Sequence, residues 1–309
     1  MALNSKNSAD DIAPGPIAWI NGRYLAASAA SLPLSDLGLQ GLAVTEMVRT
    51  YDHNIFRLND HIRRLRESLQ ACAIECDIVG LEEVSQTIAR RNSSFVASDS
   101  DIGLIMFVTA GPNPTYVSDE LKPTVCVHTF ELPLWKWTSK IQDGIELAIS
   151  KVLQLPASSM PAHAKSRSRM HWHLANKDVH RRNPNAQAVL LDHDGLLTET
   201  ATANLFAVFE DTVVTPAANV LPGISRKVVS ELCSVLGLQY EERSLRPEEI
   251  ESADELFVSS TPYGLLPVTK FEGTIVANGR PGPIFFELCN AWSELVGIDI
   301  IEQIVSAAE

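Results

Sequence analysis

The sequence predicts an α/β protein with a smaller α+β domain followed by a larger, mixed α/β domain. The chain has 309 residues, of which 45% are hydrophobic and 20% are charged. This length and composition are typical of a globular protein with one large or two medium domains. Short apolar runs bounded by turn residues occur beside single amphipathic segments in both halves, and this pattern indicates strands mixed with helices.

The boundary between the domains is expected where Pro133, Trp135 and Trp137 interrupt this pattern. The first fifteen residues are polar and lack the apolar middle of a signal peptide, so we interpret them as a disordered tail. The predicted segments are a disordered tail at 1–15, a smaller N-terminal domain at 16–130, a linker at 131–137 and a larger C-terminal domain at 138–309.

Two β-hairpins are expected in the N-terminal domain. Asn21-Gly22 separates the apolar residues 17–20 from residues 23–25, and this dipeptide is a strong signal for a tight turn with positive φ. Residues 43–51 form a second extended stretch, which a polar turn at 52–54 joins to the next apolar residues.

An amphipathic helix should follow, with Asn59 as its N-cap. Its apolar positions recur at spacings of three and four residues, at Ile62, Leu65, Leu69, Cys72 and Cys76. A second helix near residues 81–88 and buried strands at 102–109 and 124–130 complete this α+β half.

The C-terminal domain is expected to mix strands with single helices. A strand at 145–152 leads to a polar stretch that contains Lys165, and a helix then runs to Arg182. A helix after Pro222-Gly223 should end at Gly237, which is a suitable residue for the position after a helix. The further predicted strands are 188–191, 196–200, 204–209 and 213–214.

Composition argues against several classes of partner and location. The formal net charge of −13 gives an acidic surface that repels nucleic acid and anionic membranes. The five cysteines form neither a disulfide framework nor a metal-binding spacing, which fits a reducing cytoplasm. The longest apolar run, residues 102–110, has the length of a buried strand and falls far short of the ~20 residues that span a bilayer.

Common site motifs are absent, since the sequence has no GxGxxG, GxxxxGKS, GxSxG or HExxH. His171 and His173 are two residues apart and would point in different directions on a helix, so we predict no metal site. The acidic stretch at 192–195 lacks the later ligands of a calcium loop, and a hairpin turn is the better interpretation.

Three features could together bind a phosphate group. Gly223 precedes a helix whose first residues, Ile224 and Ser225, would present backbone N–H groups to an anion. Ser259-Ser260-Thr261 follows an apolar strand, and Arg64 lies early in the first predicted helix, where a guanidinium could contact a phosphate at two points. Each feature alone has a commoner explanation, namely a turn, a solvated loop or a surface charge.

Considered together, these residues resemble the class IV aminotransferases, a family that includes branched-chain and D-amino-acid aminotransferases and aminodeoxychorismate lyase. The resemblance spans residues 17–295. It depends on the following segments, in order: Asp36-Leu37-Gly38, Glu46, residues 56–65, Lys165-Ser166, residues 194–199, Asn204-Leu205-Phe206, Thr215-Pro216, residues 221–226 and residues 253–258. Thr198-Glu199 with Asn204 and the later Pro-Gly-Ile-Ser-Arg is the most specific part.

The resemblance implies a fold type IV enzyme that uses pyridoxal 5′-phosphate, with the cofactor in the cleft between two domains. It implies that Lys165 forms the internal aldimine and then moves the proton between the substrate carbon and the cofactor, and that Glu199 bonds the pyridine nitrogen. The residues implied to hold the phosphate or pack on the ring are Arg64, Ile224, Ser225, Ser260, Thr261 and Leu221. It also implies a homodimer that acts on small-molecule amino acids and 2-oxo acids.

The sequence departs from the family in three places. Thr45 replaces a common aromatic residue, the loop at 111–116 lacks the arginine and histidine that bind the substrate carboxylate in D-amino-acid enzymes, and residues 166–169 are unusually basic. The leading hypothesis is an aminotransferase of the branched-chain type or a related one. A lyase that releases pyruvate is the alternative, because Arg167 or Arg169 could hold an aromatic acid; a cofactor-binding protein without turnover is a third hypothesis.

Overall fold

The computed structural model describes residues 5–116 and 122–307, and its chain divides into two compact units. The first unit runs to Leu132 and also includes Ala164–Arg169; the second comprises Pro133–His163 and the chain from Met170 onward. The change between Leu132 and Pro133 falls within the segment predicted as a linker. The return of residues 164–169 was not predicted, and it assigns Lys165 to the first unit instead of the C-terminal domain.

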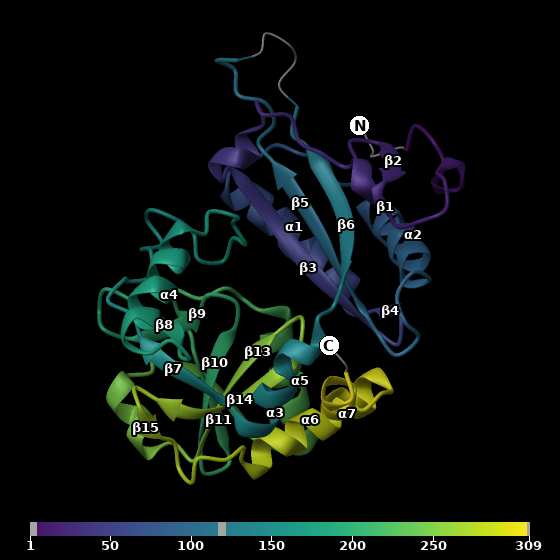
Figure 1. Cartoon of the computed structure of the whole chain (residues 1–309). Helices are drawn as coiled ribbons and strands as arrows, with labels where there is room; N and C mark the ends of the chain where they lie inside the picture. Colours follow the sequence, from purple (N-terminus) through teal and green to yellow (C-terminus); the bar gives the residue numbers. More distant parts are fainter. Residues whose placement is uncertain (1–4, 117–121, 308–309) are drawn as a thin grey trace. The chain divides into compact units, whose positions relative to one another are not determined.

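The first unit contains a six-stranded sheet in the order β2-β1-β6-β5-β3-β4, in which all neighbours are antiparallel. Two α-helices lie against it (Figure 1). Its elements are η1 (Ala9–Asp11), β1 (Ile17–Ile20), β2 (Arg23–Ala26), η2 (Ala27–Ala29), η3 (Leu37–Gln40), β3 (Ala43–Tyr51), β4 (Asn54–Ile55), α1 (Leu58–Ala71), α2 (Leu81–Ser93), β5 (Ile102–Thr109) and β6 (Val125–Glu131).

Both predicted hairpins are confirmed. Asn21 and Gly22 have φ of 47° and 87° between β1 and β2, which gives the tight turn expected of this dipeptide. Asp52 and His53 also have positive φ between β3 and β4. The buried Asp101 carboxylate fixes this second turn by accepting hydrogen bonds from the backbone N–H groups of both residues.

The helix α1 differs from its prediction at both ends. It begins at Leu58 after Arg57, which has φ of 58°, so Asn59 lies in the first turn and is not the N-cap. It ends at Ala71, and therefore the predicted apolar stripe holds within the helix only as far as Leu69. Periodicity alone cannot locate such an end, because the chain after Ala71 still packs Cys72 and Cys76 partly against the same core.

The core of the first unit lies between the sheet and the two helices. Val44 and Val48 alternate along β3 toward α1 and α2, where they join Ile62, Leu65 and Ile88 in one buried cluster. Thr45 and Met47 therefore face the opposite side of the sheet.

Residues 5–15 form an ordered segment in the structure, in place of the expected disordered tail; residues 1–4 lie outside the described part. Ser8 caps η1 and accepts a hydrogen bond from the Asp10 N–H. The Arg91 guanidinium donates to carbonyl oxygens along this segment, including those of Ile12 and Ala13 at 3.0 and 2.8 Å. One long side chain thus satisfies several backbone acceptors that would otherwise remain solvated.

The second unit contains a nine-stranded sheet in the order β12-β11-β10-β13-β14-β7-β8-β9, with β15 paired to β14. Since β9 also pairs with β10, six of these strands close into a ring. The strands are β7 (Ile145–Ile149), β8 (Gln187–Leu191), β9 (Leu197–Thr200), β10 (Asn204–Phe209), β11 (Thr212–Pro216), β12 (Gln239–Arg243), β13 (Glu255–Ser260), β14 (Gly264–Phe271) and β15 (Thr274–Ile275).

Helices pack against this sheet (Figure 1). Trp172, Ala175 and Val179 form the buried side of α4 over β8. Gly237 ends α5 with φ of 75°, as predicted. The helices of this unit are η4 (Leu134–Trp137), α3 (Thr138–Asp143), α4 (Met170–Arg182), α5 (Ile224–Leu236), η5 (Pro247–Ser252), α6 (Pro283–Val296) and α7 (Ile300–Val305). Among the described residues, none of the helices combines the length and the apolar character needed to cross a bilayer.

Candidate active site

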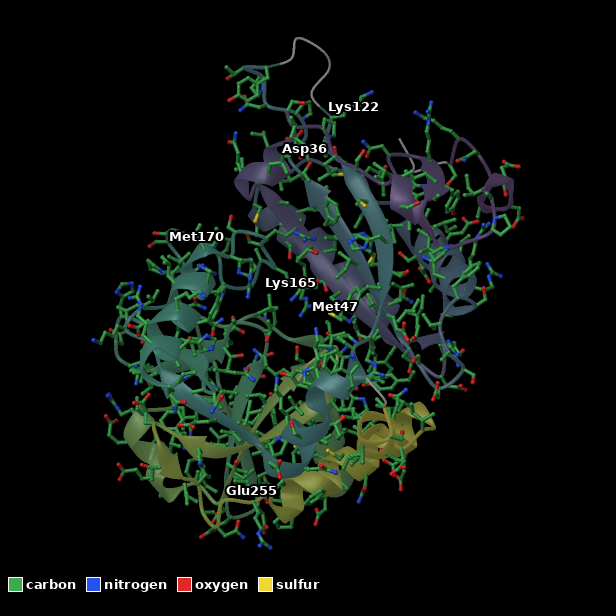
Figure 2. All side chains as sticks on the ribbon, viewed as in Figure 1. Asp36, Met47, Lys122, Lys165, Met170 and Glu255 are labelled. Carbon is green, nitrogen blue, oxygen red and sulfur yellow. The ribbon has the colours of Figure 1, made fainter. Side chains whose placement is uncertain are left out.

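Lys165 is held in the first unit by its backbone. Its carbonyl oxygen accepts a hydrogen bond from the Thr45 N–H at 2.9 Å, and its own N–H donates to Ser68 Oγ on α1 at 3.0 Å. An isolated antiparallel bridge pairs Ser166 with Val44. The side chain is half-buried and is labelled in Figure 2. The lysine predicted from the sequence is therefore fixed against both β3 and α1.

A buried carboxylate lies close to this lysine. Glu46, on β3, is fully buried and accepts hydrogen bonds from Arg64 Nε at 2.8 Å and Arg64 Nη2 at 2.7 Å. His61 Nδ1 lies 2.7 Å from the second carboxylate oxygen. We call Glu46, His61, Arg64 and Lys165 the lysine cluster.

Charge pairing fixes the protonation states in the lysine cluster. Burial by itself would raise the pKa of Glu46, but the charge and hydrogen bonds of Arg64, together with His61, lower it to about 2. Burial lowers the pKa of His61, and the positive charges of Arg64 and Lys165 act in the same direction against the effect of Glu46. At neutral pH the cluster therefore contains an ionised Glu46 and a neutral His61 that donates its Nδ1–H to it.

The contact with Glu46 restricts the orientation of Arg64, which was predicted to bind the phosphate. A two-point pair with a carboxylate holds a planar guanidinium in one orientation. Arg64 is buried and cannot rotate away without leaving Glu46 as an unpaired buried charge. Arg64 is thus a rigid cation near Lys165, and its contact with phosphate remains a prediction.

In the second unit, Glu199 is held at the end of β9. Its carboxylate oxygens accept from Asn204 Nδ2 and from the Leu221 N–H, each at 3.1 Å. Asn204 Nδ2 also donates to the Leu221 carbonyl oxygen at 2.9 Å. Glu199 is buried, so these bonds orient the carboxylate in one direction. We call Glu199, Asn204, Leu221 and Gly223 the glutamate cluster.

Gly223 is required for this arrangement. A Cβ atom at this position would lie 2.0 Å from Asn204 Oδ1, so any larger residue would displace the amide. Gly223 is also the N-cap residue of α5 and has no side chain with which to cap it. Ile224 and Ser225 therefore lie at the N-terminus of a helix, as predicted, and the contact of their N–H groups with a phosphate remains a prediction.

The predicted hydroxyl residues lie at the end of β13, beside the glutamate cluster in the sheet. Asn204 pairs with Glu199 on one side and with Ser259 on the other. Ser260 follows and donates its hydroxyl to the Thr202 carbonyl oxygen at 2.6 Å, and Thr261 begins the next turn. The Ser259 hydroxyl is buried and has no hydrogen-bond partner in the described part of the chain.

The predicted residues therefore fall into two groups. Arg64 and Lys165 belong to the first unit. The second unit contains Glu199, Leu221, Ile224, Ser225, Ser260 and Thr261. His61 was not predicted as a site residue, nor was the pairing role of Glu46. Both could have been suspected, because Glu46 lies at a core-facing position between Val44 and Val48, and a carboxylate there needs a partner.

The two sheets and the two clusters can be compared with those of known enzyme families. The family model of amino-transferase class IV matches residues 43–271. The D-alanine aminotransferase of Bacillus licheniformis is 29% identical over 85% of this chain and 91% of its own length. The branched-chain-amino-acid aminotransferase of Salmonella typhimurium is 28% identical over 86% and 88%.

Solved structures of aminotransferases have the same fold as this chain. The Escherichia coli branched-chain amino acid aminotransferase superposes with a TM-score of 0.81 at 25% identity, over 91% of this chain and 95% of that one. A second branched-chain amino acid aminotransferase, solved with pyridoxamine 5′-phosphate, has a TM-score of 0.81 at 23% identity, over 92% and 95%. The chain belongs to the class IV aminotransferases, the fold type IV family that uses pyridoxal 5′-phosphate.

Proposed function

We propose that this protein transfers an amino group from an amino acid to a 2-oxo acid, with pyridoxal 5′-phosphate as cofactor and Lys165 as the residue that binds it covalently. The observation that carries the proposal is the pair of oriented groups, a lysine fixed against β3 and α1 and a buried carboxylate at Glu199 held by Asn204 and Leu221. These are the residue types that the chemistry of this cofactor needs.

The residues present fit this cofactor. The Ser259 hydroxyl is a buried polar atom without a partner among the described residues, and it lies beside Asn204 in the sheet register. Such a group is satisfied when a polar ligand binds. The N-terminus of α5 supplies N–H groups for a phosphate, and the absence of a Cβ atom at Gly223 keeps the Asn204 amide in place. Ser260 and Thr261 would add hydroxyl groups on the same side, and Leu221 would pack against the ring.

When bound, the cofactor supplies an aldehyde carbon and a ring that accepts electrons from the substrate carbon. Lys165 Nζ would act as the nucleophile and then as the acid and base that moves a proton at the substrate carbon. Glu46 holds Arg64 rigid, so that a positive charge remains near Lys165 without being able to reorient.

Glu199 would hold a proton on the pyridine nitrogen by hydrogen bonding to it. The Glu199 carboxylate, which Asn204 Nδ2 and the Leu221 N–H orient, is an acceptor suited to the N–H of a protonated ring. A protonated ring nitrogen is what allows the ring to withdraw electrons.

Absorbance spectroscopy tests this proposal. The purified protein, loaded with pyridoxal 5′-phosphate, should be yellow, and a good amino donor should convert its spectrum to that of the pyridoxamine form. A 2-oxo acid should then restore the first spectrum, as a ping-pong route requires. If no L- or D-amino acid in a broad panel changes the spectrum of the loaded protein, transamination is the wrong assignment.

A lyase reaction that releases pyruvate is the second candidate. It is favoured by Arg167, an exposed cation two residues after Lys165 that could hold an aromatic acid. Pyruvate formed from aminodeoxychorismate without any oxo-acid acceptor would support this reaction over transamination. We also expect a homodimer in the cytoplasm, which sedimentation analysis and cell fractionation can test.

A further inference from the structure

The segment after Lys165 pairs with the edge of β3. The bridge between Ser166 and Val44 is flanked by hydrogen bonds from Thr45 N–H to the Lys165 carbonyl oxygen and from Arg167 N–H to the Ala43 carbonyl oxygen, the latter at 2.8 Å. Lys165 and Arg167 lie on either side of this bridge, and both are bonded to β3 through their backbones.

The Arg167 side chain rests on groups that orient it. Its guanidinium carbon lies 4.9 Å from the centre of the Phe107 ring, and Nη1 lies 3.5 Å from Thr45 Oγ1. Thr45 and Phe107 are directly opposite each other in the sheet register. Both belong to the face of the sheet opposite the helices, because Val44 and Val108 face the core. The aromatic ring supports the cation without neutralising it.

Arg167 also has no ionic partner among the residues that the structure describes. No described carboxylate lies within salt-bridge distance of it, in contrast to the Arg64 guanidinium, which is paired to Glu46. His128 beside Phe107 adds no positive charge at neutral pH, since burial and the charge of Arg167 both lower its pKa. The result is an exposed, oriented guanidinium without a described counter-charge, on a protein of net charge −13.

We infer that Arg167 binds the carboxylate of the amino acid or 2-oxo acid substrate. The inference rests on the proposed function and adds that a good substrate must carry a carboxylate. Simple amines, which lack this group, should therefore be poor amino donors. A guanidinium suits this role because its donors match the two oxygens of a carboxylate. The loop at residues 111–116 has no basic side chain with which to bind this carboxylate, and Arg167 supplies one instead. Thr45, small where an aromatic residue is common in the family, leaves the guanidinium room beside Phe107.

Calorimetry with a non-reacting acid gives a readout that does not depend on turnover. The probe is 4-methylvalerate, titrated into the cofactor-loaded protein, and the neutral 4-methylpentan-1-ol serves as the matched ligand without charge. Arg167→Ala should weaken binding of the acid about 10- to 100-fold, as expected for the loss of charge-assisted hydrogen bonds, and should leave the alcohol unchanged. Arg167→Lys should recover only part of the affinity, because it cannot bind at two points.

Kinetics then separate binding from chemistry. With the best amino donor of the panel, Arg167→Ala should raise KM about 10- to 100-fold with a smaller change in kcat, while the slow reaction of the corresponding amine, which lacks the carboxylate, should not change. Arg90→Ala is the control, since Arg90 is an exposed arginine of α2 in the same unit.

Three results would overturn the inference: no detectable binding of the acid to the unaltered protein, an unchanged affinity in Arg167→Ala, or a loss seen in Arg169→Ala instead. These are distinct from failure of the proposed function, which would appear as a wild-type spectrum that no donor changes.

Discussion

The lysine cluster and the glutamate cluster are held together by different kinds of interaction. In the first, the buried Glu46 carboxylate pairs with the charged Arg64 guanidinium and accepts a hydrogen bond from the neutral His61. In the second, one carboxylate is held by a neutral amide and a backbone N–H. A charge pair fixes orientation strongly but is costly when broken, whereas amide contacts are individually weaker and tolerate the loss of one partner better.

The two clusters also differ in how far apart their members lie in the sequence. In the lysine cluster, Arg64 and Glu46 are 18 positions apart, and Lys165 is 97 positions from Ser68, the residue that anchors its backbone N–H. Glu199 and Asn204 are only 5 apart, and Leu221 is 22 from Glu199. The lysine cluster therefore forms only when the first unit is folded and residues 164–169 have joined its sheet edge. Substitutions of Glu46, His61 or Arg64 should affect stability and activity together, while those in the glutamate cluster should act mainly on the cofactor.

The largest effect is expected for Lys165→Ala. Loss of the nucleophile and proton carrier should lower kcat/KM by ~10²–10⁴-fold or more, with the fold preserved because Lys165 is held through its backbone. Steady-state kinetics measures the loss, and circular dichroism with thermal unfolding checks the fold. Activity above a tenth of wild type would show that another residue does this work.

Glu199→Gln should follow, with a loss of kcat of ~10²–10³-fold, because a neutral amide cannot hold a proton on the ring nitrogen electrostatically. Its hydrogen bonds to neighbouring groups can partly persist, so stability should change little. Glu210→Gln is the matched control, since it is the same chemical change at an exposed position on the second unit. Equal activities of the two variants would remove Glu199 from the site.

Glu46→Gln should act on stability first. It leaves Arg64 buried without its counter-charge, and we expect a loss of roughly 3 kcal/mol in the free energy of unfolding at pH 7. Urea unfolding measures it, with the exposed Glu67→Gln on α1 as control. A loss no larger than that of the control would show that the charge pair contributes nothing net.

The same carboxylate predicts a pH dependence. The pKa of Glu46 is about 2 in the folded protein and 4.5 when unperturbed, so its contribution is complete above pH 4.5 and is lost as the pH falls toward 2. The difference corresponds to roughly 3 kcal/mol. Stability measured across this window should fall less steeply in Glu46→Gln than in the wild type. Parallel curves would contradict the assignment.

The smallest effect is expected for Gly223→Ala. The added methyl group would displace Asn204 Oδ1, and overpacking of this kind costs ~1–3 kcal/mol, which should appear as weaker binding of the cofactor. Gly237→Ala is the contrast, because Gly237 has φ of 75° and open space around it. That variant should lose about 1 kcal/mol of stability through backbone strain and keep the affinity for the cofactor.

Much of the local structure could be predicted from the sequence. The hairpin at Asn21-Gly22, the strands β3 and β5 and the helix end at Gly237 follow local rules of turn chemistry and periodicity, and the structure confirms them. The start of α1 and the contacts of residues 5–15 with the rest of the first unit could not be predicted. The first depends on Arg57 in a left-handed conformation, and the second on contacts from the distant Arg91.

By itself, the sequence determined the residue types of the candidate site and the order in which they occur, because short motifs act locally: Asp194-Gly195 turns the chain before β9, and Pro222-Gly223 precedes the start of α5. Only the tertiary structure decided that the segment with Lys165 returns to the sheet of the first unit, and that Glu46 pairs with Arg64 and His61. The physical reason is that a strand edge and a buried charge are satisfied by whichever group folding brings to them, however distant in sequence.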